Sequence, residues 1–316
     1  MIRTEKLTKK FGAERGVFDV NLSVPEGCIY GFVGHNGAGK TTTIKILCGL
    51  LKADSGQCFI GDLEVLPKNI SKIKQRIGYM PDITGVYEQM SVWEFLDFYG
   101  AAFKIAPKLR KKRIEEALEL TKSTQMLDYQ VASLSRGMRQ RIGLAKTLIH
   151  DPSVLILDEP AGGLDPNARI EMRQTIERLR KLGKTILLSS HILPELASVC
   201  DLVGIISKGC LIAQGTVQEI SRQIQENLII QITVDSDMGP AEELLHRITG
   251  VENIRRADKN EFSVTFTGAR DQVGSVLRLL VENGVKVRWF AENEANLEEV
   301  FMDLTTKTEK AGKGKG

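Results

Sequence analysis

Short apolar runs alternate with segments of helical pattern over the first two thirds of the chain. Val154–Leu157 is a continuous apolar run, which is typical of a central parallel strand covered on both faces. Ile29–Val33 and Thr185–Leu188 indicate two further strands of the same domain. Residues 42–50 and 135–150 have the pattern of helices. This alternation of strands and helices predicts an α/β domain.

Two further patterns complete the prediction for this domain. Arg3–Leu7 and Phe18–Val24 alternate like strands of an antiparallel edge. After residue 82 the composition becomes helical, and Ser91 and Glu94 fit a capping box at the start of one helix. We therefore expect a domain of residues 1–218 that contains an inserted helical subdomain at about 82–150.

From about residue 218 the pattern changes. Strands are expected at 228–234, 251–257, 261–267 and 285–290, with helices at 241–248 and 270–282 between them. The order βαββαβ predicts a small α+β module of ferredoxin-like fold over residues 219–305, which ends in a helix at Asn296–Thr305. Residues 306–316 are mostly lysine and glycine, and we expect them to be disordered.

Composition narrows the class of protein. The 316 residues suffice for about two domains, and a net charge of only +3 gives no reason to expect a nucleic-acid partner. No run approaches about 18 uncharged apolar residues, so we expect no membrane span. The first residues lead into no apolar signal core, and the five cysteines are scattered without a paired motif. We expect a cytoplasmic protein with reduced thiols.

One stretch carries a specific chemistry. Gly34–Thr41 fits the phosphate-binding pattern of glycine, four residues, glycine, lysine and a hydroxyl residue, between a strand and a helix. Glycines let the backbone approach a polyphosphate, and successive N–H groups form an anion nest at the positive end of the helix. Lys40 can reach the β and γ phosphates and Thr41 can ligate Mg²⁺. A turn that merely joins strand to helix is the alternative, which the full pattern in this context disfavours. The expected nucleotide-binding residues here are Gly34, His35, Asn36, Gly37, Ala38, Gly39, Lys40, Thr41 and Thr42.

Two carboxylates follow the apolar run. Asp158 and Glu159 stand at the expected carboxyl end of a buried strand, where such charges are costly unless a metal or a catalytic task holds them. His191 follows the next expected strand. A lone histidine in that position is usually structural, so its assignment depends on its neighbours.

Two more candidates have plain structural alternatives. Phe11 precedes a loop and could stack on an adenine base, or it could be an ordinary packed aromatic residue. Ser135 is placed to cap a helix whose start Gly137 leaves open, which suits a second anion site. A plain helix cap is the preferred explanation when these residues are taken alone.

In their order and spacing, these stretches resemble the nucleotide-binding subunit of ABC transporters over residues 1 to about 218. The C-terminal segment, which ends in Leu297–Leu304, looks like the accessory tail of subunits that serve ABC-2-type exporters. The matching elements are Phe11, Gly34–Thr41, the Asp82 loop, the signature Leu134–Met138, Asp158–Glu159, Asp165 and His191.

The resemblance implies a role for each residue. Asp158 would hold Mg²⁺ through water, Glu159 would polarise the attacking water, and His191 would bond the γ-phosphate. Two subunits would sandwich two ATP molecules head to tail, with Ser135 and Gly137 completing the site of the other subunit. The implied catalytic residues are Glu159, His191 and Lys40, and the implied metal-binding residues are Thr41, Asp158 and Asp82.

The chain departs from the family pattern in three places. Asp82 stands where glutamine is usual, and the signature has Arg136 and Met138 where glycine and glutamine are commonest. The loop after Glu159 is rich in small residues, Ala161–Gly163. An aspartate at 82 could reach Mg²⁺ through water, turn toward a basic residue of the permease, or cap a turn after a proline. We favour contact with the permease.

The resemblance therefore implies an ATP-binding and hydrolysing subunit that uses ATP and Mg²⁺. It would work as a homodimer on the cytoplasmic face of the membrane and drive a separate permease, for export of a drug, lipid, peptide or polysaccharide. A soluble ABC-type ATPase acting on ribosomes or DNA is the first alternative, which the single ATPase unit and the lack of a heptad run disfavour. A regulatory ATPase with a ligand-sensing C-terminal domain is the second.

Overall fold

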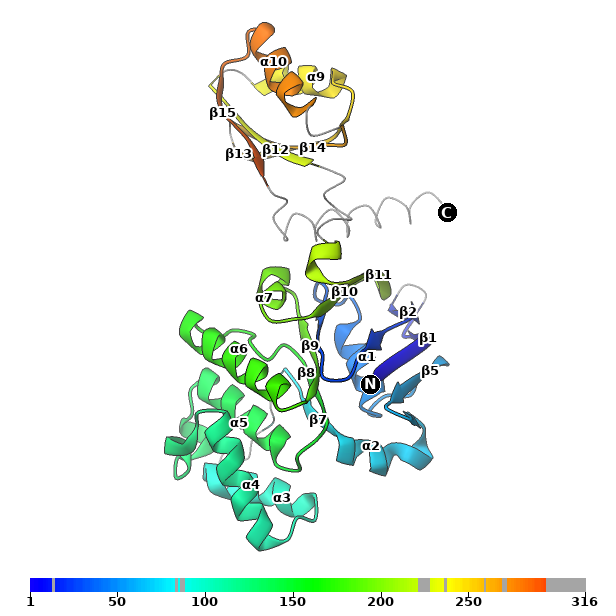
Figure 1. Ribbon diagram of the computed structural model, residues 1–316, viewed down its shortest axis with the longest axis vertical. Coiled ribbons are helices and arrows are strands. Elements are labelled where there is room, and N and C mark those ends of the chain that lie inside the picture. The colour runs from blue at the N-terminus through cyan, green and yellow to red at the C-terminus, as the bar shows by residue number, and fades with distance from the viewer. Residues whose placement is uncertain are drawn as a thin grey trace. The chain divides into compact units, whose positions relative to one another are not determined.

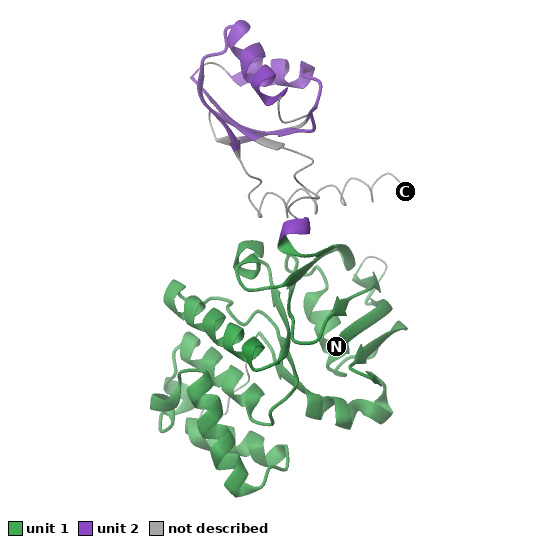
Figure 2. Cartoon of the chain, in the orientation of Figure 1, with its two compact units in different colours: residues 1–217 green, residues 218–316 purple. Residues whose placement is uncertain are grey.

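The computed structural model describes residues 1–12, 15–82, 85, 89–220, 228–235, 238–258, 260–268 and 272–293 (Figure 1). The chain forms two compact units, residues 1–217 and 218–316 (Figure 2). No helix in these described ranges is long and apolar enough to cross a membrane.

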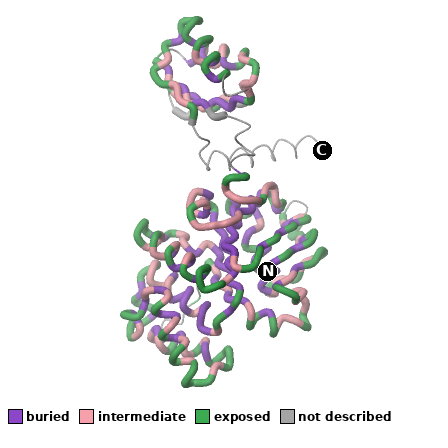
Figure 3. Tube along the Cα trace, in the orientation of Figure 1, coloured by how far each residue is buried: buried purple, intermediate pink, exposed green. Residues whose placement is uncertain are grey.

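A six-stranded sheet forms the centre of the first unit. Its order is β11-β10-β4-β9-β8-β7, and all neighbours are parallel except β11, which pairs antiparallel with β10. Every residue of β4, β8 and β9 is buried, as expected of strands covered on both faces (Figure 3). The strands are β4 (Ile29–Val33), β7 (Ile77–Met80), β8 (Val154–Leu157), β9 (Thr185–Ser190), β10 (Leu202–Ser207) and β11 (Cys210–Gly215).

A second, antiparallel sheet packs beside the first. One buried cluster contains Leu7 and Ile60 of this sheet, Ile44 of helix α1 and Phe32 of β4, so α1 packs against both sheets. The elements are β1 (Ile2–Lys10), β2 (Gly16–Val20), β3 (Ser23–Val24), β5 (Ser55–Ile60), β6 (Leu63–Glu64), α1 (Lys40–Leu47), the 3₁₀ turn Pro67–Asn69 and α2 (Ile70–Arg76).

The strand expected at Phe18–Val24 is two strands in the structure. β2 pairs with β1 in one register, and β3 pairs with the start of β1 in another. Asp19 adopts a left-handed φ of 49°, and the pairing of β1 with β2 shifts between Leu7 and Lys9. This irregularity breaks the continuous alternation that the sequence indicates.

Helices fill the segment between β7 and β8 and cover the sheet. Helix α3 begins at the predicted capping box, in which the Ser91 hydroxyl accepts from the Glu94 N–H and the Glu94 carboxylate accepts from the Ser91 N–H. Helix α5 contacts β7. Between β7 and β8 lie α3 (Val92–Ala102), α4 (Pro107–Leu120), 3₁₀ turns at Thr124–Met126 and Val131–Ser133, and α5 (Arg136–Leu148). Helix α6 (Pro166–Lys181) follows β8, and α7 (Leu193–Ala197) follows β9.

Residues 228–293 of the second unit, as far as they are described, form one sheet with helices α9 and α10. Its order β13-β14-β12-β15, with antiparallel neighbours and the element order βαββαβ, confirms the ferredoxin-like prediction. The elements are β12 (Leu228–Val234), α9 (Met238–Arg247), β13 (Val251–Asp258), β14 (Glu261–Phe266), α10 (Val273–Glu282) and β15 (Val287–Asn293). The predicted helix at 296–305 and the lysine- and glycine-rich residues 306–316 lie outside the described residues.

The second unit has a hydrophobic core of its own, which includes Ile230, Phe262 and Leu280. We therefore expect residues 220–305 to unfold cooperatively as an isolated segment, as followed by circular dichroism in urea. Phe262→Ala should lower its free energy of unfolding by about 3–5 kcal/mol, because it leaves a cavity in this core. Trp289→Ala is the control, because Trp289 is 62% exposed and its loss should cost less than about 0.5 kcal/mol. A segment without a cooperative transition would contradict an independent domain.

Candidate active site

The phosphate loop, residues 34–41, connects β4 to α1. Gly34 has no room for a side chain, because a Cβ there would lie 2.6 Å from the Ile206 carbonyl oxygen. Gly37 and Gly39 have φ angles of 83° and 111°, in the left-handed region that glycine adopts most easily. Gly39 directly precedes the first residue of α1, so the loop ends at the positive end of the helix.

Lys40 is buried inside this loop. Its Nζ donates to the carbonyl oxygens of Gly34 at 2.5 Å and His35 at 3.4 Å. The same ammonium lies 3.3 Å from Oε1 of Glu159. The lysine charge is therefore balanced by loop carbonyls and one carboxylate, and a phosphate group could replace these partners.

Asp158 is 2% exposed and is held by two hydroxyl groups. Thr41 Oγ1 donates to its Oδ2 at 2.9 Å, and Ser189 Oγ donates to its Oδ1 at 2.6 Å. Ser189 Oγ also accepts from the Glu159 N–H at 3.0 Å. Ser189 was not among the expected site residues. Its sequence signal is a hydroxyl pair, Ser189–Ser190, that ends an otherwise apolar strand next to the strand of Asp158.

Glu159 lies between a lysine and a histidine. Its Oε2 is 3.0 Å from His191 Nδ1, and its buried Oε1 faces Lys40 without a hydrogen bond among the described residues. The backbone of Glu159 has a φ of 50°, which is uncommon for a residue with a side chain and is worth about 1–3 kcal/mol of strain. Such strained residues cluster at functional sites because surrounding structure must hold them in place.

Strand order brings these groups together. β4, β9 and β8 are neighbours in the sheet. The phosphate loop follows β4, Asp158 and Glu159 follow β8, and Ser189 lies at the carboxyl end of β9 with His191 directly after that strand. Ligand sites of open α/β sheets form at this edge. The structure thus places Lys40, Thr41, Asp158, Glu159 and His191 in one cluster.

Asp82 lies near the loop after Glu159. Its carbonyl oxygen accepts from Gln140 Nε2 at 3.3 Å, which joins it to α5. A Cβ built on Gly162 would lie 3.7 Å from the Asp82 Oδ1, so the carboxylate approaches that loop. No hydrogen bond or ion pair links Asp82 to Thr41 or Asp158 among the residues described.

Phe11 lies on the surface after β1. Its ring is 58% exposed, with Lys9 Nζ 5.9 Å from the ring centroid. The start of β2 runs beside the phosphate loop, because a Cβ on Gly39 would lie 2.7 Å from Val17 Cγ1. The ring is therefore not a core residue, and it is free to stack on a planar ligand.

The signature, residues 134–138, forms the start of α5. Ser135 is exposed and caps the helix by accepting from the Met138 N–H at 3.3 Å. Within the described part of the chain, no hydrogen bond or ion pair joins Ser135 or Gly137 to residues 34–41. The structure leaves this helix start outside the cluster around Lys40.

The donor set of the cluster fits Mg²⁺. Thr41 and Asp158 offer one hydroxyl and one carboxylate, and Mg²⁺ commonly takes one or two carboxylates together with substrate phosphates and water. The described residues contain no group of three or more His, Cys, Asp or Glu side chains able to hold a metal by themselves. A divalent cation would therefore bind here together with a polyphosphate.

Comparison with known proteins agrees with this geometry. A family model described as ABC transporter matches residues 17–162, and one described as ATP-binding protein DrrA1-3-like, C-terminal domain, matches residues 215–305. The linearmycin resistance ATP-binding protein LnrL of Bacillus subtilis is 32% identical over 312 residues, 98% of this chain and 99% of that protein. The bacitracin transport ATP-binding protein BcrA of Bacillus licheniformis is 37% identical over 311 residues, 96% and 97% of the two chains.

A solved structure is similar as well. The protein CbiO1 of Clostridium perfringens, part of an ABC transporter complex, is 28% identical. The match has a TM-score of 0.62 and covers 71% of this chain and 94% of the other.

Ser189 provides a test of the geometry. Ser189→Ala removes a hydrogen bond from buried Asp158 and another from the Glu159 N–H. The loss of a bond to a charged group costs about 1.5–3 kcal/mol, so we expect phosphate release from ATP to slow by roughly tenfold or more. Ser198→Ala is the control, because Ser198 bonds Arg173 on the surface. Equal rates for both variants would show that Asp158 does not depend on Ser189.

Proposed function

This chain belongs to the ATP-binding subunits of ABC transporters, which hydrolyse ATP for transport, and we propose that two copies of it drive a separate permease for export. The full-length similarity to proteins named for bacitracin transport and linearmycin resistance supports an antibiotic or a related peptide or lipid-like compound as the cargo. The subunit would act at the cytoplasmic face of the membrane, beside that permease.

The observation that carries the proposal is the cluster of Lys40, Glu159 and His191 at the phosphate loop. Loop N–H groups and the Lys40 ammonium would bind the phosphates of ATP, and Lys40 would leave its Gly34 and Glu159 partners to do so. Thr41 and Asp158 would hold Mg²⁺, which neutralises phosphate charge when bound. Phe11 would stack on the adenine.

Glu159 is proposed as the general base. Its buried Oε1 lacks a hydrogen bond among the described residues, so it has a lone pair to offer a water molecule once Lys40 turns to phosphate. His191 contacts the other carboxylate oxygen at 3.0 Å and orients it. In this arrangement His191 can also reach the γ-phosphate.

The second copy is proposed because one chain leaves two features unused. Ser135 and the backbone at Gly137 form an exposed helix start, where an anion binds favourably, and they lie outside the Lys40 cluster. In a head-to-tail pair each helix start would face the nucleotide of the other copy. Hydrolysis would then require closure of the dimer.

Glu159→Gln tests this proposal directly. The variant should bind ATP with an affinity close to that of the unchanged chain, lose more than about 100-fold in turnover, and accumulate as a dimer in ATP. Phosphate release and sizing chromatography measure these effects. Glu115→Gln is the control, because Glu115 is exposed on α4. Unchanged turnover in Glu159→Gln would exclude Glu159 as the base.

Asp82 is proposed to report on the permease instead of binding the metal, because its carboxylate approaches Gly162. Asp82→Ala should keep the basal ATPase rate of the isolated subunit within a few fold and lose the stimulation seen with the permease present. Asp128→Ala, at an exposed position of the helical subdomain, should keep both. A collapse of the basal rate with normal ATP affinity would place Asp82 at the metal.

A further inference from the structure

Two departures from the family pattern touch each other in this structure. The guanidinium of Arg136, in the signature, lies over Gly163, in the loop after Glu159. A Cβ built on Gly163 would overlap the Cζ and both Nη atoms of Arg136. Gly163 also has a φ of 65°, so any side chain there would be strained as well as obstructed.

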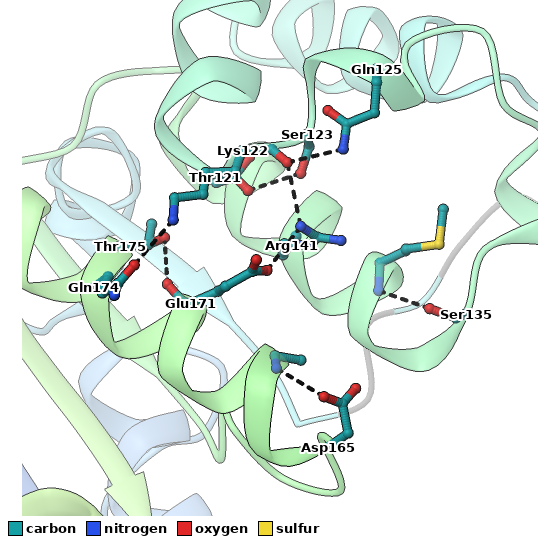
Figure 4. A network of polar contacts seen from close by, with 12 residues as sticks. Thr121, Lys122, Ser123, Gln125, Ser135, Arg141, Asp165, Glu171, Gln174 and Thr175 are labelled. Carbon is teal, nitrogen blue, oxygen red and sulfur yellow. Dashed lines mark hydrogen bonds and ion pairs between the residues drawn. The ribbon is translucent and has the colours of Figure 1, made fainter.

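The same two elements lie close together at a second point. A Cβ added to Gly137 would be in van der Waals contact with Ala168 Cβ at 3.5 Å and Leu164 Cδ2 at 3.7 Å. The start of α5 therefore lies beside the loop and the first turn of α6, which Asp165 caps through the Ala168 N–H. Figure 4 shows Ser135 and Asp165 at the starts of these two helices. Farther along, Arg141 of α5 pairs with Glu171 of α6 at 3.1 Å.

The loop from Glu159 to Asp165 is short and internally bonded. The Gly162 N–H donates to the Glu159 carbonyl at 3.0 Å, and the Leu164 N–H donates to the Ala161 carbonyl at 3.3 Å. Two consecutive turns thus connect Gly163 to the strained backbone of Glu159. Because only these two hydrogen-bonded turns separate Gly163 from Glu159, a displacement of Gly163 also moves Glu159.

The stacking on Gly163 is what locates the Arg136 side chain. Within the described ranges, its guanidinium forms no hydrogen bond or ion pair, and α5 has no acidic residue in its first turn. A cation at the first turn of a helix is unfavourable unless an anion is near. Arg136 is an exposed residue, and its contact with Gly163 involves no charge pairing.

We propose that Arg136 is a positioning residue that ties the signature to the loop carrying Glu159 of the same chain. The proposal rests on the proposed dimer and on Glu159 as the base. When the signature docks on the nucleotide of the second copy, Arg136 and Gly163 carry the 159–165 loop with it, and Glu159 moves into position in its own site. Each site then hydrolyses ATP only after the signature of the same chain has bound the nucleotide of the second copy.

Three variants test the tie in the full-length protein. Arg136→Ala removes the side chain, Arg136→Lys keeps the charge without a planar group that can stack, and Gly163→Ala displaces Arg136 by overlap. All three should lower kcat by roughly tenfold or more, keep KM and ATP affinity within about twofold, and lower the Hill coefficient for ATP toward 1.

The control is Gly183→Ala. Gly183 also has a left-handed φ, 81°, but a Cβ there meets no atom within 4 Å. It should therefore show the cost of the backbone angle alone, with kcat and cooperativity unchanged. Wild-type kcat and Hill coefficient in Arg136→Ala or in Gly163→Ala would overturn the proposal, and so would full activity in Arg136→Lys, because charge alone would then suffice.

Mixed dimers show which site Arg136 serves. In the first mixed dimer, one copy carries Arg136→Ala with Glu159 intact, and the other copy carries Glu159→Gln. In the second mixed dimer, one copy carries both substitutions, and the other copy is unchanged. Compared with a dimer of an unchanged copy and a Glu159→Gln copy, we expect the first to lose activity and the second to keep it. The reverse result would mean that Arg136 acts on the nucleotide of the other copy, and would overturn the tie.

Hydrogen exchange tests the proposal without a measurement of ATP hydrolysis. In dimers trapped with ATP by Glu159→Gln, amides of residues 159–165 should exchange several-fold faster when Arg136→Ala is added, and equal exchange would overturn the proposal. Failure of the proposed function itself is visible separately, because Glu159→Gln alone would then form no dimer in ATP.

Discussion

The buried carboxylate of Asp158 is the group on which the rest of the site depends. A carboxylate removed from water is costly unless it is bonded or paired, and here two hydroxyl groups, from Thr41 and Ser189, donate hydrogen bonds to it. Those hydroxyls come from the helix after the phosphate loop and from β9. One carboxylate thereby joins three elements of the sheet edge and keeps a negative charge available for a divalent cation.

The negative charge of Asp158 affects the pKa values of two neighbouring groups. Burial, and then the negative charge of Asp158, raise the pKa of the Cys48 thiol, and the same two causes raise the pKa of the Tyr79 phenol. Both groups therefore stay neutral to a higher pH than an exposed thiol or phenol would.

The sequence predicted the regular parts of this site and missed the contacts that depend on strand order. The phosphate loop, the apolar strands and the βαββαβ module follow from local patterns, which neighbouring residues determine. Ser189 was not predicted as a site residue because its importance arises from the pairing of β8 with β9. The break between β2 and β3 was missed because apolar and polar residues alternate without interruption over residues 18–24, although aspartate is one of the residue types that adopt a left-handed φ. The roles given to Ser135, Gly137 and Asp82 remain predictions, since they involve a second chain.

The contact between Arg136 and Gly163 joins two places where the chain departs from the family pattern. An arginine at 136 needs a flat, open surface for its guanidinium, and only a residue without a Cβ provides one at 163. A glycine at 136 would leave that surface bare, and the loop would lose its contact with the signature there. Gly163 is therefore the steric complement of the arginine, because any side chain at 163 would overlap the guanidinium.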